Sequence, residues 1–125
     1  MSVVVDQAAH HRIPPEQALE MTQQFYRLFM VPGMGHCFGG EGPSSFGQNG
    51  QRATQADPEH DTLSALERWV ESGVAPEQFM AARLNAKTGE ADMTRPICAY
   101  PHKPVWNGSG SASDAINFKC SDTRH

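Results

Sequence analysis

A dense run of glycine follows an apolar segment and limits what this chain can fold into. The segment FYRLFMV spans residues 25–31, and a Pro-Gly pair ends it. Residues 33–50 then hold seven of the eleven glycines in the sequence. We predict a buried strand over residues 25–31, because the segment is apolar almost throughout and rich in aromatic residues, and a helix stays open as the alternative over so short a window. We predict a loop after it, and long loops in compact domains are uncommon unless they are functional or disordered.

The clearest helix signal is the stretch DPEHDTLSALERWVESG, residues 57–73. Asp57 can cap the N-terminus, Pro58 suits the first helical position, and Gly73 follows the last turn. One face carries the apolar residues Leu63, Leu66, Trp69 and Val70, and charged residues lie opposite. Trp69 is interpreted as a core residue, and the alternative is that it supports His36 from under the glycine-rich loop.

Shorter elements complete the expected order. Proline opens a short helix over residues 14–22. We expect a strand ending at residue 84, a turn over 85–91, an extended and proline-broken stretch over 95–106, and a last strand or extended tail over 115–120. The order strand, loop, helix, strand and tail predicts the α/β class. It is typical of the C-terminal end of an α/β sheet, loop-rich and incomplete on its own.

Composition excludes several classes of partner. The chain has 125 residues and a net charge of −4, and its ten Lys and Arg residues are scattered, so it lacks a basic footprint for nucleic acid. No apolar run reaches the roughly 18 residues of a membrane span. Only three apolar residues in a row follow Met1-Ser2, too few for the core of a signal peptide. We therefore expect no nucleic acid, no membrane and no signal peptide in this chain.

The glycine-rich loop places one histidine beside one cysteine, His36 and Cys37. A catalytic histidine presents one ring nitrogen to a nucleophile while an acid holds the other. A loop that leaves the carboxyl end of a strand can present a side chain in this way. In α/β hydrolases the histidine is the last triad member along the chain, which matches His36 between a predicted strand and a predicted helix. Spacing alone nevertheless favours a polar loop histidine without a catalytic role.

Three segments and the spacing between them resemble the C-terminal part of the tannase and feruloyl esterase family. They are FYRLFMVPGMGHCFGGEGPSSFGQ, ALERWVESGVAPEQFMAARL and TRPICAYPHKPVWNGSGSASDAINFKC. The resemblance covers residues 25–120, and VPGMGHC is its most specific motif. It implies an α/β-hydrolase fold, with residues 1–24 a partial N-terminal segment and residues 25–125 the C-terminal part of the catalytic domain. It also implies a secreted or periplasmic serine carboxylic ester hydrolase that cleaves phenolic acid esters such as gallates and ferulates.

The same resemblance implies roles for single residues. His36 takes the place of the triad base. Cys37 takes the place of a cysteine that bonds to another beside the nucleophilic serine, outside this chain. Cys98 and Cys120 match a pair that staples the C-terminal tail. The family's calcium site lies in a lid domain elsewhere, so no cofactor or metal ligand is implied in this segment.

The nucleophile and the acid of the triad lack counterparts in this sequence. Ser45, in PSSFG, follows a glycine loop and not a strand, so we interpret it as a loop residue. Asp6 and the IPP at residues 13–15 echo the family's acid motif, but six residues separate them. Asp6 is interpreted as a solvated aspartate near a terminus. We expect the chain to be inactive alone.

The residues leave two other interpretations open, a zinc site and a small binding module. Six histidines and three cysteines suggest zinc, yet none shows the C-x₂₋₄-C or H-x₃₋₅-H spacing of structural zinc sites. The odd cysteine count implies a free thiol, a bond to another chain or a missing partner. The rival function is a small disulfide-stapled binding module without enzymatic activity. Such a module would unfold cooperatively by itself, whereas a fragment would be marginally stable because its strand edges lack cover.

Overall fold

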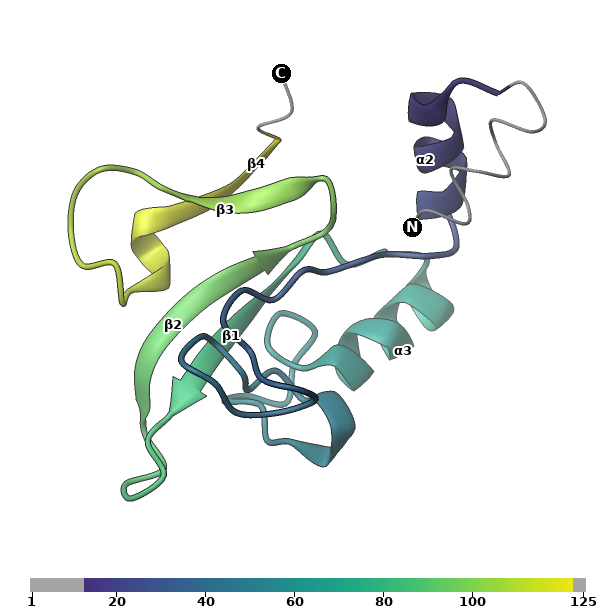
Figure 1. The fold of residues 1–125 in the computed structure, drawn as a ribbon. Helices are drawn as coiled ribbons and strands as arrows, with labels where there is room; N and C mark the ends of the chain where they lie inside the picture. Colours follow the sequence, from purple (N-terminus) through teal and green to yellow (C-terminus); the bar gives the residue numbers. More distant parts are fainter. Residues whose placement is uncertain (1–12, 123–125) are drawn as a thin grey trace.

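The computed structural model describes residues 13–122, which form two α-helices and four short strands (Figure 1). The helices are α2 (Pro15–Gln23) and α3 (Thr62–Ser72), and the strands are β1 (Gln78–Leu84), β2 (Ala91–Cys98), β3 (His102–Trp106) and β4 (Phe118–Asp122). Single 3₁₀ turns cover Gln48–Gly50 and Ala115–Asn117. The strands form two antiparallel pairs, β1–β2 and β3–β4. Helix and strand are mixed as predicted, but the described residues contain no parallel sheet.

Local signals predicted several of these elements correctly. Helix α2 begins at Pro15, where a missing N–H costs nothing. Strand β1 pairs with β2 along its whole length, and the predicted turn joins them. In that turn Asn85 Oδ1 accepts hydrogen bonds from the backbone N–H groups of Lys87 and Thr88. Short-range hydrogen bonding by an Asn side chain is the usual reason for a turn at such a sequence.

The core is small and lies between the β1–β2 hairpin and α3 (Figure 1). Its buried members are Phe46, Ala65, Phe79, Ala81 and Ile97. The ring of Phe29 packs on that of Phe79 with 4.8 Å between centroids. A disulfide between Cys98 and Cys120 ties β2 to β4, with 5.7 Å between Cα atoms. The extended segment that carries Phe29 is thus packed on the hairpin, and the loop that follows it is held close to β1.

The prediction of a strand over residues 25–31 is wrong for the described structure. The segment is extended, but it belongs to neither sheet and forms one isolated bridge, Phe29 with Ala99. Beside it, the backbone N–H of Tyr100 donates to the carbonyl of Leu28 at 2.7 Å. Because β2 ends at Cys98 and the chain turns at Tyr100, the backbone contacts described between this part of the chain and the segment come from Ala99 and Tyr100. Pairing therefore stops after one bridge.

The predicted start of the second helix also needs correction. Its N-cap is Asp61, whose side chain accepts a hydrogen bond from Ser64 N at 2.9 Å. Asp57 instead closes a turn, because its carbonyl accepts from the backbone N–H groups of His60 and Asp61. Pro58 lies in that turn and not in the helix. The predicted end is confirmed, since Gly73 has φ 71° and its N–H donates to Trp69 O.

The apolar face predicted for α3 is largely exposed. Leu63, Leu66 and Val70 keep 60%, 52% and 78% of their surface accessible. The fully buried residue of the helix is Ala65. Trp69 is only half-buried, so its interpretation as a core residue is wrong here. An amphipathic helix normally buries its apolar stripe, and the described residues do not provide the cover.

The turn before α3 predicts a pH dependence of stability. Asp57 Oδ1 accepts from His60 Nδ1 at 2.7 Å and from two backbone N–H groups at 3.0 Å. The hydrogen bond from His60 is the main cause that lowers the pKa of Asp57 below its ordinary value of 3.8. A depressed folded-state pKa stabilises the fold above the unfolded-state pKa, and this contribution is lost as pH falls through the folded-state pKa.

We therefore expect Asp57→Asn to reduce the loss of stability in acid. The measurement is the midpoint of thermal unfolding at about pH 6 and about pH 3, where the parent should lose more than the variant. Glu67→Gln is the matched control, because Glu67 is an exposed acid on α3. If the fall in midpoint between these two pH values became smaller by the same amount in Asp57→Asn and Glu67→Gln, the role of the Asp57–His60 hydrogen bond would be contradicted.

Candidate active-site loop

Residues 33–42 form a narrow hairpin-like loop with His36 at its tip. Gly42 N donates to Gly33 O, and Gly35 N donates to Gly39 O, both at 2.9 Å. These two bonds bring the arms of the loop together and leave residues 36–38 exposed. The predicted loop is confirmed, and it is ordered by its own backbone hydrogen bonds.

Glycine is needed at two places where the arms approach. Gly40 has φ 97°, in the left-handed region, and a Cβ there would overlap the carbonyl oxygen of Gly33. A Cβ on Gly42 would likewise overlap the carbonyl oxygen of Pro32. A side chain at either position would force the arms apart. The glycine run is therefore what allows the loop to fold back so tightly.

The loop is fixed to strand β1 at its second arm. The backbone N–H groups of Ser44 and Ser45 both donate to Ala82 O, at 3.0 and 2.8 Å. Arg83 Nη1 donates to Glu41 O at 2.6 Å, which joins positions 42 residues apart. Ser45 is buried by this pairing, which agrees with its interpretation as a loop residue. The sequence contains no local signal that predicts the contact between Arg83 and Glu41.

At the tip, His36 and Cys37 lie against each other. Cys37 Sγ is 3.3 Å from His36 Nδ1, and both side chains are exposed. Cys37 has φ 70°, a conformation that costs a non-glycine residue energy and that clusters at functional sites. In the described part of the chain, this sulfur is the hydrogen-bond partner of the imidazole. The ring is thus placed where a group from another segment could reach it.

The structure does not assemble a triad around His36. Within residues 13–122, no carboxylate is hydrogen-bonded to His36, and the one serine singled out, Ser45, is buried by β1. Asp6 lies outside the described residues. Cys37 is a free thiol, while Cys98 and Cys120 are bonded to each other, which is the pairing that the family resemblance implies.

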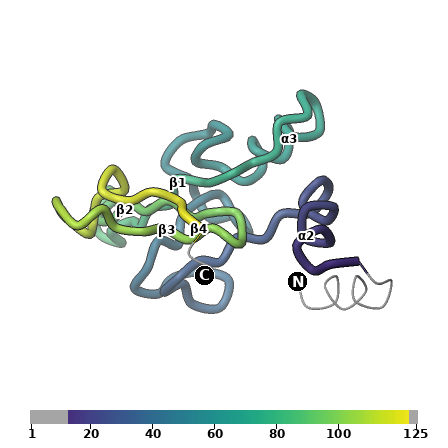
Figure 2. The backbone as a smooth tube through the Cα atoms, turned by 90° about the horizontal axis from the view of Figure 1, so that it is seen from above, coloured from purple at the N-terminus to yellow at the C-terminus, as the bar shows by residue number. Residues whose placement is uncertain are grey.

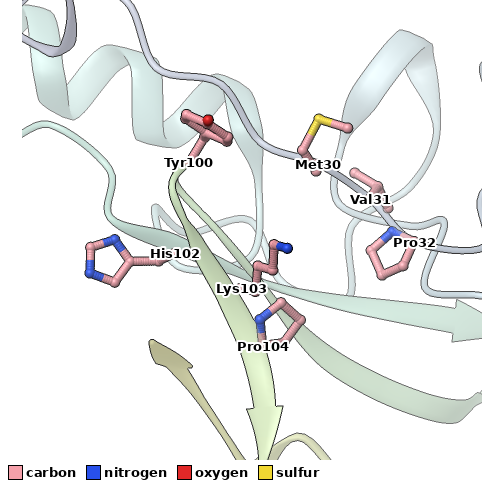
Figure 3. Close-up of a pocket in the computed structure, with 7 residues that line it drawn as sticks. All are labelled: Met30, Val31, Pro32, Tyr100, His102, Lys103 and Pro104. Atoms are coloured by element: carbon pink, nitrogen blue, oxygen red, sulfur yellow. The ribbon is translucent and has the colours of Figure 1, made fainter. Parts of the chain in front are cut away.

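A cavity of about 580 Å³ lies beside the segment that leads into the loop (Figure 3). Its walls are mostly apolar and come from the extended segment, the turn and β3: Met30, Val31, Pro32, Tyr100, His102, Lys103 and Pro104. His36 does not line it, and Figure 3 shows the ring of His102 directed away from Met30 and Val31. The cavity is therefore separate from the tip of the loop that carries His36.

Residues 13–122 contain neither a cluster of metal-binding side chains nor a membrane-spanning helix. No three side chains of His, Cys, Asp or Glu lie close enough together to hold a metal ion there. None of the helices there has the length and apolar content to cross a membrane.

Known proteins are similar to this chain in sequence and in fold. The family model described as tannase and feruloyl esterase matches residues 3–121. An uncharacterized esterase of Xanthomonas campestris pv. campestris is 53% identical over an alignment of 111 positions, which covers 86% of this chain and 19% of that protein. A probable feruloyl esterase B-1 of Aspergillus flavus is 38% identical over an alignment of 109 positions, which covers 86% of this chain and 20% of that protein.

A solved structure matches as well. The crystal structure of feruloyl esterase B from Aspergillus oryzae superposes with a TM-score of 0.74 and 33% identity, covering 91% of this chain and 22% of that one. The chain therefore spans about a fifth of the length of the relatives it matches. Because the family model covers nearly all of the sequence, this chain belongs to the tannase and feruloyl esterase family.

Proposed function

We propose that this chain is the C-terminal part of a serine esterase for phenolic acid esters, and that His36 is its general base. The observation that carries the proposal is the position of His36. It is an exposed imidazole at the tip of a tight, glycine-dependent loop, inside the region that matches the esterase family. The loop is anchored to β1, which would hold the ring in a defined place. Residues 25–125 are assigned to an α/β-hydrolase catalytic domain and residues 1–24 to a partial segment before it.

In this proposal the nucleophilic serine and the acid come from other parts of the enzyme. The serine hydroxyl attacks the ester carbonyl carbon while His36 accepts the hydroxyl proton. The resulting tetrahedral intermediate collapses to an acyl-enzyme, and His36 donates the proton to the oxygen of the leaving alcohol. Water then attacks the acyl-enzyme in the same way, which releases the phenolic acid and restores the serine.

Cys37 has a supporting role in the proposal. We assign it a disulfide with a cysteine beside the nucleophilic serine, outside this chain. A disulfide keeps its two Cα atoms roughly 4.4–6.8 Å apart, so it would hold base and nucleophile within reach of each other. The exposure of Cys37 at the loop tip leaves its sulfur accessible for such a bond.

The Cys98–Cys120 disulfide supports a secreted or periplasmic location, since disulfides persist in oxidising compartments. The proposal assigns no cofactor or metal to this segment.

The proposed function predicts that the purified 125-residue chain does not hydrolyse methyl ferulate or methyl gallate. We expect no hydrolysis because a general base without a nucleophile and an oxyanion hole cannot cleave an ester. The matched positive sample is a chimera, in which the 111 matching residues of the Xanthomonas esterase are replaced by those of this chain. We expect that chimera to release phenolic acid. Hydrolysis by the isolated chain that disappears in its His36→Ala variant would contradict the proposal of a fragment.

A further inference from the structure

Exposed apolar side chains gather between the end of α2 and the outer side of α3. Phe25 keeps 75% of its surface accessible, beside the exposed Leu66 and Val70. Together with Gln24 and Trp69 these residues line a groove of about 310 Å³, here called the α3 groove. Both views of the molecule place α2 and α3 on one side of the strands (Figures 1 and 2). The lining of the groove comes from the residues that follow α2 and from α3. The α3 groove is thus an apolar surface at one end of the fold.

Two charged residues, Arg27 and Glu77, lie beside the α3 groove without lining it. The guanidinium of Arg27 lies 6.0 Å from the ring centroid of Trp69 and pairs with Glu77 at 3.1 Å. The cation is therefore already engaged by a ring and a carboxylate within the chain. No Lys, Arg, Asp or Glu lines the groove itself. The chemistry of the surface suits an apolar occupant and not a charged ligand.

The extended segment that starts at Phe25 offers a second, continuous contact surface. The N–H groups of Phe25 and Tyr26 donate to Thr22 O at the end of α2. Beyond them, the described pairing of the segment consists of the bridge between Phe29 and Ala99 and the bond from Tyr100 N to Leu28 O. Extended backbone with one unpaired side readily accepts another strand. Because Phe25 both opens this segment and lines the α3 groove, one partner could cover the groove and pair with the edge.

Resting on the proposed function, we infer that the α3 groove and the adjoining edge form the docking surface for the serine-bearing remainder of the esterase. The length of the relatives supports this occupant. In feruloyl esterase B from Aspergillus oryzae, the matching region is 22% of a much longer chain, so most of that polypeptide lies outside it. The helix face predicted to be buried is the one that lines the groove. A covered groove would also explain why an amphipathic helix buries only an alanine here.

The test compares the same substitutions in two contexts, the isolated chain and the Xanthomonas chimera. Val70→Asp places a charge in the α3 groove, and Ile116→Asp is the matched control, since Ile116 is 88% exposed and lies on the 3₁₀ turn before β4. In the isolated chain we expect neither variant to lower the midpoint of thermal unfolding. In the chimera we expect Val70→Asp to lower that midpoint by several degrees, and Ile116→Asp to leave it unchanged.

Three other outcomes of this experiment also decide for or against the docking surface. If the Val70→Asp chimera is insoluble while the Ile116→Asp chimera is not, the milder Val70→Ala should lower the midpoint in the same direction. Equal midpoints for the parent, Val70→Asp and Ile116→Asp chimeras would overturn it. So would an isolated chain that is a dimer by light scattering and becomes a monomer with Val70→Asp, because the occupant would then be a second copy.

Failure of the docking surface and failure of the proposed function give different results. If the docking surface is wrong but the function is right, His36→Ala abolishes esterase activity and Val70→Asp leaves the chimera's midpoint intact. If the function is wrong but the surface is right, Val70→Asp lowers the midpoint and His36→Ala keeps the activity.

Discussion

Replacing His36 by alanine in the chimera should lower kcat for methyl ferulate by about 10²–10⁴-fold, the range typical of a lost general base. KM should change little, because the ring acts on the proton of the nucleophile and does not need to hold the substrate. The unfolding midpoint should also stay unchanged, since the imidazole is exposed and its hydrogen-bond partner among the described residues is the neighbouring Cys37. The measurement is steady-state kinetics of the chimera and its variant.

His102→Ala is the matched control for this experiment. His102 is also an exposed histidine, but it lies at the start of β3 and outside the glycine loop. Its replacement should leave kcat within about twofold of the parent, since a surface side chain without a catalytic partner contributes little to the chemical step. An equal drop in kcat for both variants would show that the loss is general and would contradict the assignment of His36.

Removing the disulfide should be the largest single loss of stability in the isolated chain. Cys98 and Cys120 are 22 positions apart, and opening a loop of this size costs about 3 kcal/mol in the chain-entropy model. The bond also holds the β3–β4 pair against β2. We expect Cys98→Ser with Cys120→Ser to lower the free energy of unfolding in urea by about that amount, and to move the midpoint to lower urea.

Cys37→Ser provides the comparison within the same chain. Cys37 is exposed and unbonded, so its replacement should leave the free energy of unfolding in urea within about 0.5 kcal/mol of the parent. An unchanged urea midpoint in the double serine variant would contradict the structural role given to the disulfide.

Elements fixed by neighbouring residues were predictable from the sequence. Pro15 at the first position of α2, Gly73 after α3 and the Asn85 turn each act within a few residues. The start of α3 shows the limit of such signals. Asp57 and Asp61 are both residues that favour the N-cap position. Because the side chain of Asp57 is hydrogen-bonded to the turn before the helix, Asp61 is the residue that caps α3.

Features that depend on distant partners were not predictable in the same way. A nearly continuous apolar run predicted a strand at residues 25–31, but a strand needs a neighbour along its whole length and Ala99 supplies one bridge. The exposed face of α3 has the same cause, because periodicity shows which face is apolar and not whether anything covers it. Both differences concern surfaces that the remainder of the enzyme is proposed to cover.

The candidate site was predictable in part. The glycine run indicated a tight loop, and the close approach of its arms at Gly40 and Gly42 gives the physical reason for it. The anchoring of the loop by Arg83 and Ala82 could not be seen in the sequence, since it joins residues about 40 positions apart. The catalytic role of His36 rests on residues of other segments, so it stays a proposal.

The most direct test is the rate at which a serine-directed organophosphate modifies the chimera. Phosphorylation needs the serine to be deprotonated as it attacks, but needs neither ester binding nor release of an alcohol product. If His36 is the base, His36→Ala should slow this modification about as much as it slows ester cleavage, and His102→Ala should not slow it. An unchanged rate of serine modification in the His36→Ala chimera would contradict the assignment.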